Sequence, residues 1–201
     1  MQKIMKSLAS LFLLTFTATS QASIIVSIAP ATLTSAPGLP IEIALKIAGL
    51  GNGTALGAYD LNVNFDPALL SFQNAQFGDP TLGDQLDLAH LGLSNPLSLP
   101  GTGTVNLIET SLDSASVLTT QQASAFTLAT LSFASLGLGN TPITITINSL
   151  ADANSLALDA TTQLGNVSVA AVPLPLSFLL MLSGLGLLPM SQKRSKIPGT
   201  D

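Results

Sequence analysis

Four polar side chains alternate with four apolar ones in the segment YDLNVNFD, which spans residues 59–66. In an extended strand, successive side chains point to opposite faces, so Asp60, Asn62 and Asn64 would share one face and Tyr59 would lie on the other. A carboxylate beside two amides can bind a polar partner through hydrogen bonds. Taken alone, the pattern indicates an ordinary solvated strand face on which Asp60, Asn62 and Asn64 are accessible hydrogen-bonding groups.

The acidic residues and the single histidine do not predict catalysis. Asp60 and Asp66 would lie about 20 Å apart at the usual strand rise, whereas the two carboxyl groups of a glycosidase lie about 5 to 9.5 Å apart. His90 lies in an irregular segment, and the sequence contains no Gly-x-Ser-x-Gly motif. We therefore expect His90 to be an exposed loop residue rather than a catalytic base, and we predict that the protein is not an enzyme.

A possible metal site would use the acidic residues Asp79, Asp84 and Asp87, which gather in a glycine-containing stretch. Calcium prefers several carboxylate and carbonyl oxygens, but the spacing of these residues fits no EF-hand. The absence of cysteine excludes a zinc–thiolate site and a disulfide framework. We expect a solvated acidic loop, and predict neither a metal nor a cofactor.

Charge is scarce and unevenly distributed along the 201 residues, of which only 8% are charged. Residues 23–171 carry ten acids and a single base, Lys46. Nucleic-acid binding rests on phosphate neutralisation by Lys and Arg, so nucleic acid is excluded as a partner. Stacking on sugars would normally use an exposed aromatic platform, yet tryptophan is absent and the only tyrosine, Tyr59, falls on the apolar face.

Period-two alternation recurs through residues 23–171 and indicates short, half-buried strands. In residues 126–134 the apolar phase shifts between Leu128 and Leu131, which predicts a β-bulge or a strand covered on both faces. Residues 78–102 show no sustained period, and we expect a long excursion there. Eight or nine strands of this kind predict an all-β sandwich. The expected strands cover residues 24–28, 41–47, 59–66, 70–77, 104–109, 126–134, 143–147 and 166–170.

The two ends of the chain are predicted to be targeting segments. Residues 1–22 resemble a secretory signal peptide, with Lys3 and Lys6 followed by an apolar stretch and a small-x-small cleavage site; a membrane anchor is the alternative. Residues 172–190 contain no charge and would span about 28 Å as a helix, close to a bilayer core of about 30 Å; a buried core helix is the alternative. The basic residues Lys193, Arg194 and Lys196 in the tail 191–201 predict a cytoplasmic C-terminus, with residues 23–171 outside the inner membrane.

This C-terminal arrangement resembles the PEP-CTERM sorting tail of Gram-negative bacteria. The matching elements are Val172-Pro173-Leu174-Pro175, the apolar stretch, and the basic cluster. Leu174 replaces the glutamate of the family name, and five residues follow the basic cluster. The resemblance implies recognition by an exosortase-type sorting protease, removal of the tail, and release or attachment at the cell surface.

The central region resembles the cohesin family in the order of its segments. These are YDLNVNFDP with its following Leu70, FTLATLSF at 126–133, a Gly139-Asn140-Thr141 turn and a closing strand from Gly165. The resemblance implies a cohesin-like jelly-roll β-sandwich of about nine strands that binds a dockerin-like protein. The family's contact aspartate matches Asp60, so the resemblance makes Asp60, with Asn62 and Asn64 on the same face, candidate partner-binding residues; an ordinary solvated strand face is the alternative. The family's asparagine two residues before the aspartate is replaced by Ala58.

Together these observations predict a signal peptide (1–22), a cohesin-like sandwich (23–171), one transmembrane helix (172–190) and a cytoplasmic tail (191–201). The expected protein is a non-enzymatic binding or adhesion module, exported and held by its C-terminal helix before it reaches the cell envelope or surface. Its partner would be a dockerin-like protein or a polysaccharide matrix. The alternative is a carbohydrate-binding module that contacts exopolysaccharide or another glycan.

Overall fold

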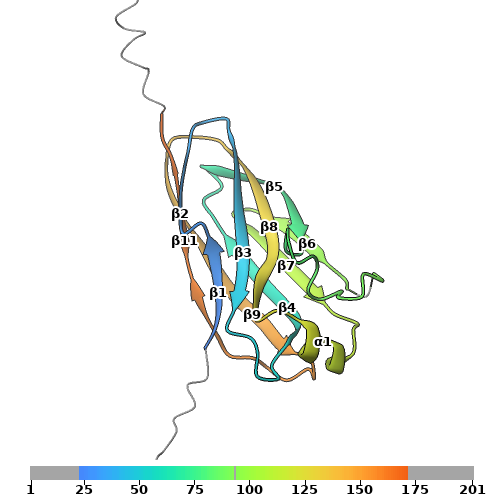
Figure 1. The fold of residues 1–201 in the computed structure, drawn as a ribbon. Coiled ribbons are helices and arrows are strands. Elements are labelled where there is room, and N and C mark those ends of the chain that lie inside the picture. The colour runs from blue at the N-terminus through green and yellow to red at the C-terminus, as the bar shows by residue number, and fades with distance from the viewer. Residues whose placement is uncertain (1–22, 93, 172–201) are drawn as a thin grey trace, which may run out of the picture.

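The structure, a computed structural model, describes residues 23–92 and 94–171. Two sheets pack face to face in a β-sandwich (Figure 1). The five-stranded sheet has the order β10(Ala160–Gln163), β1(Ile24–Ala29), β3(Pro40–Ala48), β8(Ala125–Ser135), β5(Leu70–Phe77). The six-stranded sheet has the order β2(Thr32–Ser35), β11(Gly165–Val169), β9(Gly139–Asp152), β4(Leu56–Asn64), β7(Thr104–Thr110), β6(Leu97–Gly101).

The core between the sheets is formed by the apolar halves of the alternating strands. On β4, the side chains of Tyr59, Leu61 and Val63 are almost completely buried, which confirms the phase expected from the sequence. Phe133 of β8 lies edge-on to the rings of Phe65 and Phe72, at centroid distances of 5.0 and 5.8 Å. These T-shaped contacts connect the segment after β4 with β8 and with the edge strand β5.

The phase shift in β8 is a β-bulge, as predicted. In the pairing of β3 with β8, Leu45 lies opposite Ala129 and Lys46 opposite Thr127, so Leu128 has no partner. The bulge turns Phe126 and Leu128, as well as Leu131, toward the core. A continuous alternation would have placed the first two on the opposite face from Leu131.

The expectation of about nine strands is corrected to eleven, with one short helix, α1(Ala115–Gln121). Two additional strands, β2 and β10, are four residues long and pair in parallel with β11 and β1. Such short segments contain too few residues to display an alternation. A third additional strand, β6, lies inside the long excursion predicted at 78–102. The irregular part is therefore shorter than expected and ends where β6 begins.

The ends of the described chain lie at opposite ends of the sandwich (Figure 1). Ala171 leaves from what we call the exit end, formed by the turns at 36–39, 65–69, 101–104 and 136–139. Ser23 lies at the other end, which we call the acidic end, formed by the loops at 49–55, 78–96, 111–124 and 152–159. The predicted signal peptide (1–22), transmembrane helix (172–190) and tail (191–201) lie outside the described residues. Among the described residues, no helix has the length and apolar character needed to cross a membrane.

Candidate functional site

The predicted site residues lie together on the outer face of the six-stranded sheet. β4 is an inner strand of that sheet, between β9 and β7. Asp60, Asn62 and Asn64 are half-buried and point away from the core, as the alternation predicted. The structure adds Asn106 from β7 and Asn148, Thr144 and Thr146 from β9, and we call these seven side chains the polar strip.

Hydrogen bonds connect the polar strip across three strands. The Asn106 Nδ2 group donates to Asp60 Oδ1 at 2.5 Å and to Asn62 Oδ1 at 2.9 Å. From the other side, Asn148 Nδ2 donates to the same Asp60 oxygen at 2.8 Å. Asn64 Nδ2 donates to the hydroxyl of Thr146 at 3.2 Å. These cross-strand bonds restrain the side chains and give the sheet a fixed polar surface.

Sequence reasoning did not name Asn106 or Asn148 as site residues, although both fall on the polar side of an alternating segment. Asn106 occupies an outward position in the alternation of 104–109, so its face was predictable although its pairing with Asn62 was not. Asn148 lies at a register shift, because Asp60 pairs with Ser149 and Leu61 with Ile147. The bulge brings the Asn148 amide within hydrogen-bonding distance of Asp60.

An apolar margin borders the polar strip on the side of β6. Ile108 of β7 lies opposite Asp60 on one side and opposite Leu97 of the edge strand on the other. Leu97 and Leu99 are 44% and 49% exposed, whereas Ile108 is half-buried. The face thus combines a polar centre with an exposed aliphatic edge, as protein–protein interfaces often combine polar and apolar groups.

Behind the polar strip, on the inner surface of the same strands, lies a buried polar pair. Tyr59 of β4 donates its hydroxyl to Glu109 Oε2 of β7 at 2.8 Å, while Glu109 Oε1 has no hydrogen-bond partner among the described residues. Burial and the nearby Asp84 carboxylate raise the pKa of Glu109 to about 7, although the hydrogen bond from Tyr59 and the nearby Ser94 hydroxyl oppose the shift. Burial, with Glu109 beside it, raises the pKa of Tyr59 well above its usual value.

The three aspartates considered for calcium each hold a different part of the 78–96 loop. Asp84 accepts from Leu86 N and from the Ser94 hydroxyl, both at 2.8 Å. Asp87 accepts from the backbone of Leu91 and Gly92. No three acidic or histidine side chains form a possible metal-binding group in residues 23–92 and 94–171. The carboxylates of this stretch therefore stabilise the turns of the loop by accepting hydrogen bonds from it.

Asp79 fixes the start of that loop to β8. Its Oδ1 accepts from Thr81 N and the Thr81 hydroxyl, and its Oδ2 accepts from Thr127 N at 2.8 Å. Desolvation opposes ionisation of this carboxyl, but the bonds from Thr81, Thr127 and Leu82 outweigh it and hold the pKa of Asp79 well below its usual range. His90 is exposed on the same loop, as predicted, and has a φ of 53°.

Comparison with known proteins identifies the architecture. No protein-family model and no curated protein sequence matches the chain. Among solved structures, it resembles the Coh-OlpA–Doc918 cohesin–dockerin complex of Clostridium thermocellum, with a TM-score of 0.59 and 12% identity over 74% of this chain and 99% of that one. The chain has a cohesin-like fold.

Two further cohesins support this conclusion. The sixth cohesin of scaffoldin B from Acetivibrio cellulolyticus, solved with a Cel5 dockerin, has a TM-score of 0.56 and 16% identity over 74% of this chain and 99% of that one. A non-cellulosomal cohesin from the archaeon Archaeoglobus fulgidus has a TM-score of 0.56 and 14% identity over 75% of this chain and 93% of that one. The cohesin-like domain therefore corresponds to nearly the whole of each cohesin.

Proposed function

We propose that this protein is an exported, non-enzymatic binding module that recognises a dockerin-like protein through the polar strip and its apolar margin. The observation that carries the proposal is the position of Asp60. It lies at the centre of an exposed sheet face and accepts hydrogen bonds from β7 and β9 through one oxygen, Oδ1. Its Oδ2 makes no hydrogen bond within the described chain and remains available to a partner's donors. Cohesins in the solved complexes bind dockerins, and the fold supports a partner of that kind.

Ala58 distinguishes the proposed interface from the cohesin pattern. The resemblance places an asparagine of the family at this position, two residues before the aspartate on the same face of β4. In its place Ala58 pairs with Thr110 of β7 and offers only a methyl group. We therefore expect a partner that makes its polar contacts further along β4, at Asp60 and Asn62, and apolar contacts at Leu97 and Leu99.

Isothermal titration of the full chain with a panel of purified dockerin modules tests this function. We expect at least one module to bind, and Asp60→Ala to weaken that binding by about tenfold or more, because a charged hydrogen-bond acceptor at an interface centre is lost. Asp159→Ala is the matched control, since it removes an exposed carboxylate at the acidic end. Equal affinities of the two variants would contradict the assignment of the site, and an absence of binding across the panel would contradict the dockerin-like partner.

We also propose that residues 1–22 direct export and that residues 172–201 hold the domain at the inner membrane until an exosortase-type protease sorts it to the cell surface. The exit end supports the membrane attachment. Ala170 N donates to Ser35 O at 2.9 Å, and the uncharged stretch begins two residues later. Two residues reach at most about 7 Å, so a spanning segment would keep the exit end beside the bilayer.

The side chains on the surface of the exit end are compatible with a position beside the bilayer. Leu39, Leu136 and Leu138 are 54–59% exposed there, and Asp66 is the only charged residue in its turns. Exposed leucines also occur at the acidic end, for example Leu91 and Leu156, but they lie among several carboxylates. An aliphatic surface with little charge has a lower cost of contact with lipid than an acidic one.

Cell fractionation combined with intact-mass measurement tests the sorting proposal. We expect two truncated species in sequence, one lacking residues 1–22 and a surface species that also lacks the C-terminal tail. Replacing Pro173 and Pro175 with alanine should leave the tail attached and the protein in the inner membrane. The control replaces the exposed Pro37 and Pro40 at the exit end. Unchanged mass and location of the Pro173 and Pro175 variant would contradict recognition of this motif.

A further inference from the structure

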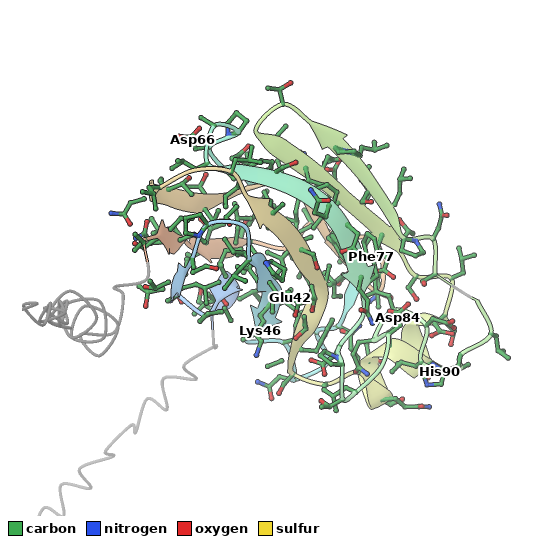
Figure 2. The ribbon with its side chains drawn as sticks, turned by 90° about the horizontal axis from the view of Figure 1, so that it is seen from above. Glu42, Lys46, Asp66, Phe77, Asp84 and His90 are labelled. Carbon is green, nitrogen blue, oxygen red and sulfur yellow. The ribbon has the colours of Figure 1, made fainter. Side chains whose placement is uncertain are left out.

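The outer face of the five-stranded sheet carries a groove that the proposed function does not use. It has a volume of about 320 Å³ and runs over β3, β8 and β5, with the turn after β5 as its wall. Figure 2 shows Glu42 on β3 and Phe77 on β5, the two strands that flank β8. The polar side chains that line it are Glu42, Asn74, Gln76, Thr130 and Ser132.

Strand register arranges these side chains in two rows. Glu42, Ser132 and Asn74 lie opposite one another across the three strands, and Thr130 lies between Ala44 and Gln76 in the next row. Strands about 4.8 Å apart and rows about 7 Å apart give a polar grid of about 10 by 7 Å. This size is comparable to the footprint of a short oligosaccharide.

A β-bulge in β5 creates the polar edge of the groove. The pairing with β8 passes from Phe72 opposite Phe133 to Asn74 opposite Ser132, and Gln73 is left without a partner. Phe72 faces the core, so an uninterrupted strand would have turned Asn74 and Gln76 inward as well. The bulge turns both amides outward, a re-aiming of side chains that bulges provide near binding sites.

The polar groups of the groove are available to a ligand. Within the described part of the chain, none of these five side chains forms a hydrogen bond to another protein group. The wall, in contrast, is fixed: Gly78 N donates to Leu128 O at 2.9 Å, and the Asp79 carboxylate is bonded to Thr81 and Thr127. A rigid wall beside free donors and acceptors reduces the ordering cost of binding.

From this arrangement we infer that the groove is a glycan-binding site for a neutral, hydroxyl-rich polysaccharide chain. Amides and hydroxyls both donate and accept, as sugar hydroxyls do, and Glu42 adds two acceptor oxygens. The exposed Pro80 lines the same groove and offers apolar surface to the C–H face of a sugar ring. The free carboxylate of Glu42 disfavours an anionic chain. The single base on this sheet, Lys46, lies four residues along β3 from Glu42 and does not line the groove.

This inference does not depend on the partner proposed for the polar strip, because the two sites lie on different sheets. Native affinity electrophoresis of the full chain through gels that contain soluble xylan, galactomannan, hydroxyethylcellulose or the anionic alginate tests it. We expect retardation by at least one neutral polysaccharide and none by alginate. Replacing Asn74 and Gln76 together with alanine should weaken that retardation by about tenfold, because two bidentate amides are lost.

Controls separate loss of the site from loss of the fold. Asp60→Ala alters the other sheet and should leave the retardation unchanged, and Gln73→Ala alters the bulge residue, whose amide bonds to Ser71 instead of lining the groove. Thermal melts of every variant should match that of the parent chain. Retardation by none of the neutral polysaccharides, by alginate alone, or to the same extent in the double variant would overturn the inference.

Discussion

The outer faces of the two sheets carry polar side chains in opposite hydrogen-bonding states. In the polar strip of β4, the amides of Asn106, Asn148 and Asn64 donate to neighbouring strip residues. In the groove of β3, β8 and β5, the polar side chains bond to no other protein group that the structure describes. The first arrangement holds the polar side chains in fixed positions, while the second leaves donors and acceptors free for the proposed glycan. Hydrogen-bond satisfaction therefore distinguishes two polar faces that composition alone would treat alike.

The largest expected effect is a loss of stability caused by a substitution in the core that lies between the two sheets. Phe133→Ala deletes the ring that contacts Phe65 and Phe72, and should lower the free energy of unfolding by about 3 to 5 kcal/mol. Partner binding and glycan binding should then fall together, in proportion to the unfolded fraction. Denaturant unfolding monitored by circular dichroism measures the loss, and a destabilisation below 1 kcal/mol, on the order of a surface substitution, would contradict the role given to this ring.

The next effect concerns the buried pair behind the polar strip. The pKa of Glu109 is about 7 in the folded protein, against about 4.3 for an unperturbed glutamate. The folded state therefore retains a proton that the unfolded state releases. Its stabilising contribution is complete below about pH 4.3, declines as the pH rises, and is lost above about 7. The total decline from this group should be about 4 kcal/mol.

Glu109→Gln tests this pH dependence because glutamine mimics the protonated side chain. Unfolding curves between pH 4 and 8 should be flatter for the variant, which should exceed the parent chain in stability at pH 8. Tyr59→Phe provides a comparison that removes the donor to Glu109 and keeps the carboxyl group. Equal slopes for Glu109→Gln and the parent chain would show that this carboxyl ionises normally.

A smaller effect distinguishes the polar strip from a set of independent side chains. Asn106→Ala removes donations to Asp60, Asn62 and the Leu61 carbonyl, and should cost about 1 kcal/mol of stability. It should also weaken partner binding, because Asp60 loses one of its two positioning contacts. A double-mutant cycle with Asp60→Ala should give a coupling energy of at least 0.5 kcal/mol, on the order expected for residues in contact. Strictly additive effects would contradict the connected strip.

The smallest expected effect lies in the groove. Ser132→Ala removes a hydroxyl that bonds to no protein group within the described residues, so the free energy of unfolding should change by less than about 0.5 kcal/mol. Polysaccharide retardation should nevertheless decrease. If chemical denaturation instead gives a loss above about 1 kcal/mol, this hydroxyl has a structural role, and the contrast between the two faces would weaken.

Local alternation was enough to predict β4, its inward Tyr59 and its outward Asp60, because side-chain direction in a strand depends only on position. The bulge at Leu128 could also be predicted, because the apolar residues of this strand change phase between Leu128 and Leu131. Partners across strands were not predictable: Asn106 and Asn148 are 46 and 88 residues from Asp60. The bulge at Gln73 was not predicted either, although the apolar residues change phase there, from Leu70 and Phe72 to Ala75 and Phe77. The short strands β2 and β10 depend on parallel pairing with distant segments.

The most direct test of the account is a comparison of dockerin-module affinity between Asp60→Ala and the Asn74→Ala/Gln76→Ala double variant, measured by isothermal titration on full-length chains of matched thermal stability. We expect an affinity reduced by about tenfold or more for Asp60→Ala and an unchanged affinity for the groove variant. A greater loss in the groove variant, or equal losses in both, would contradict the assignment of protein recognition to the polar strip.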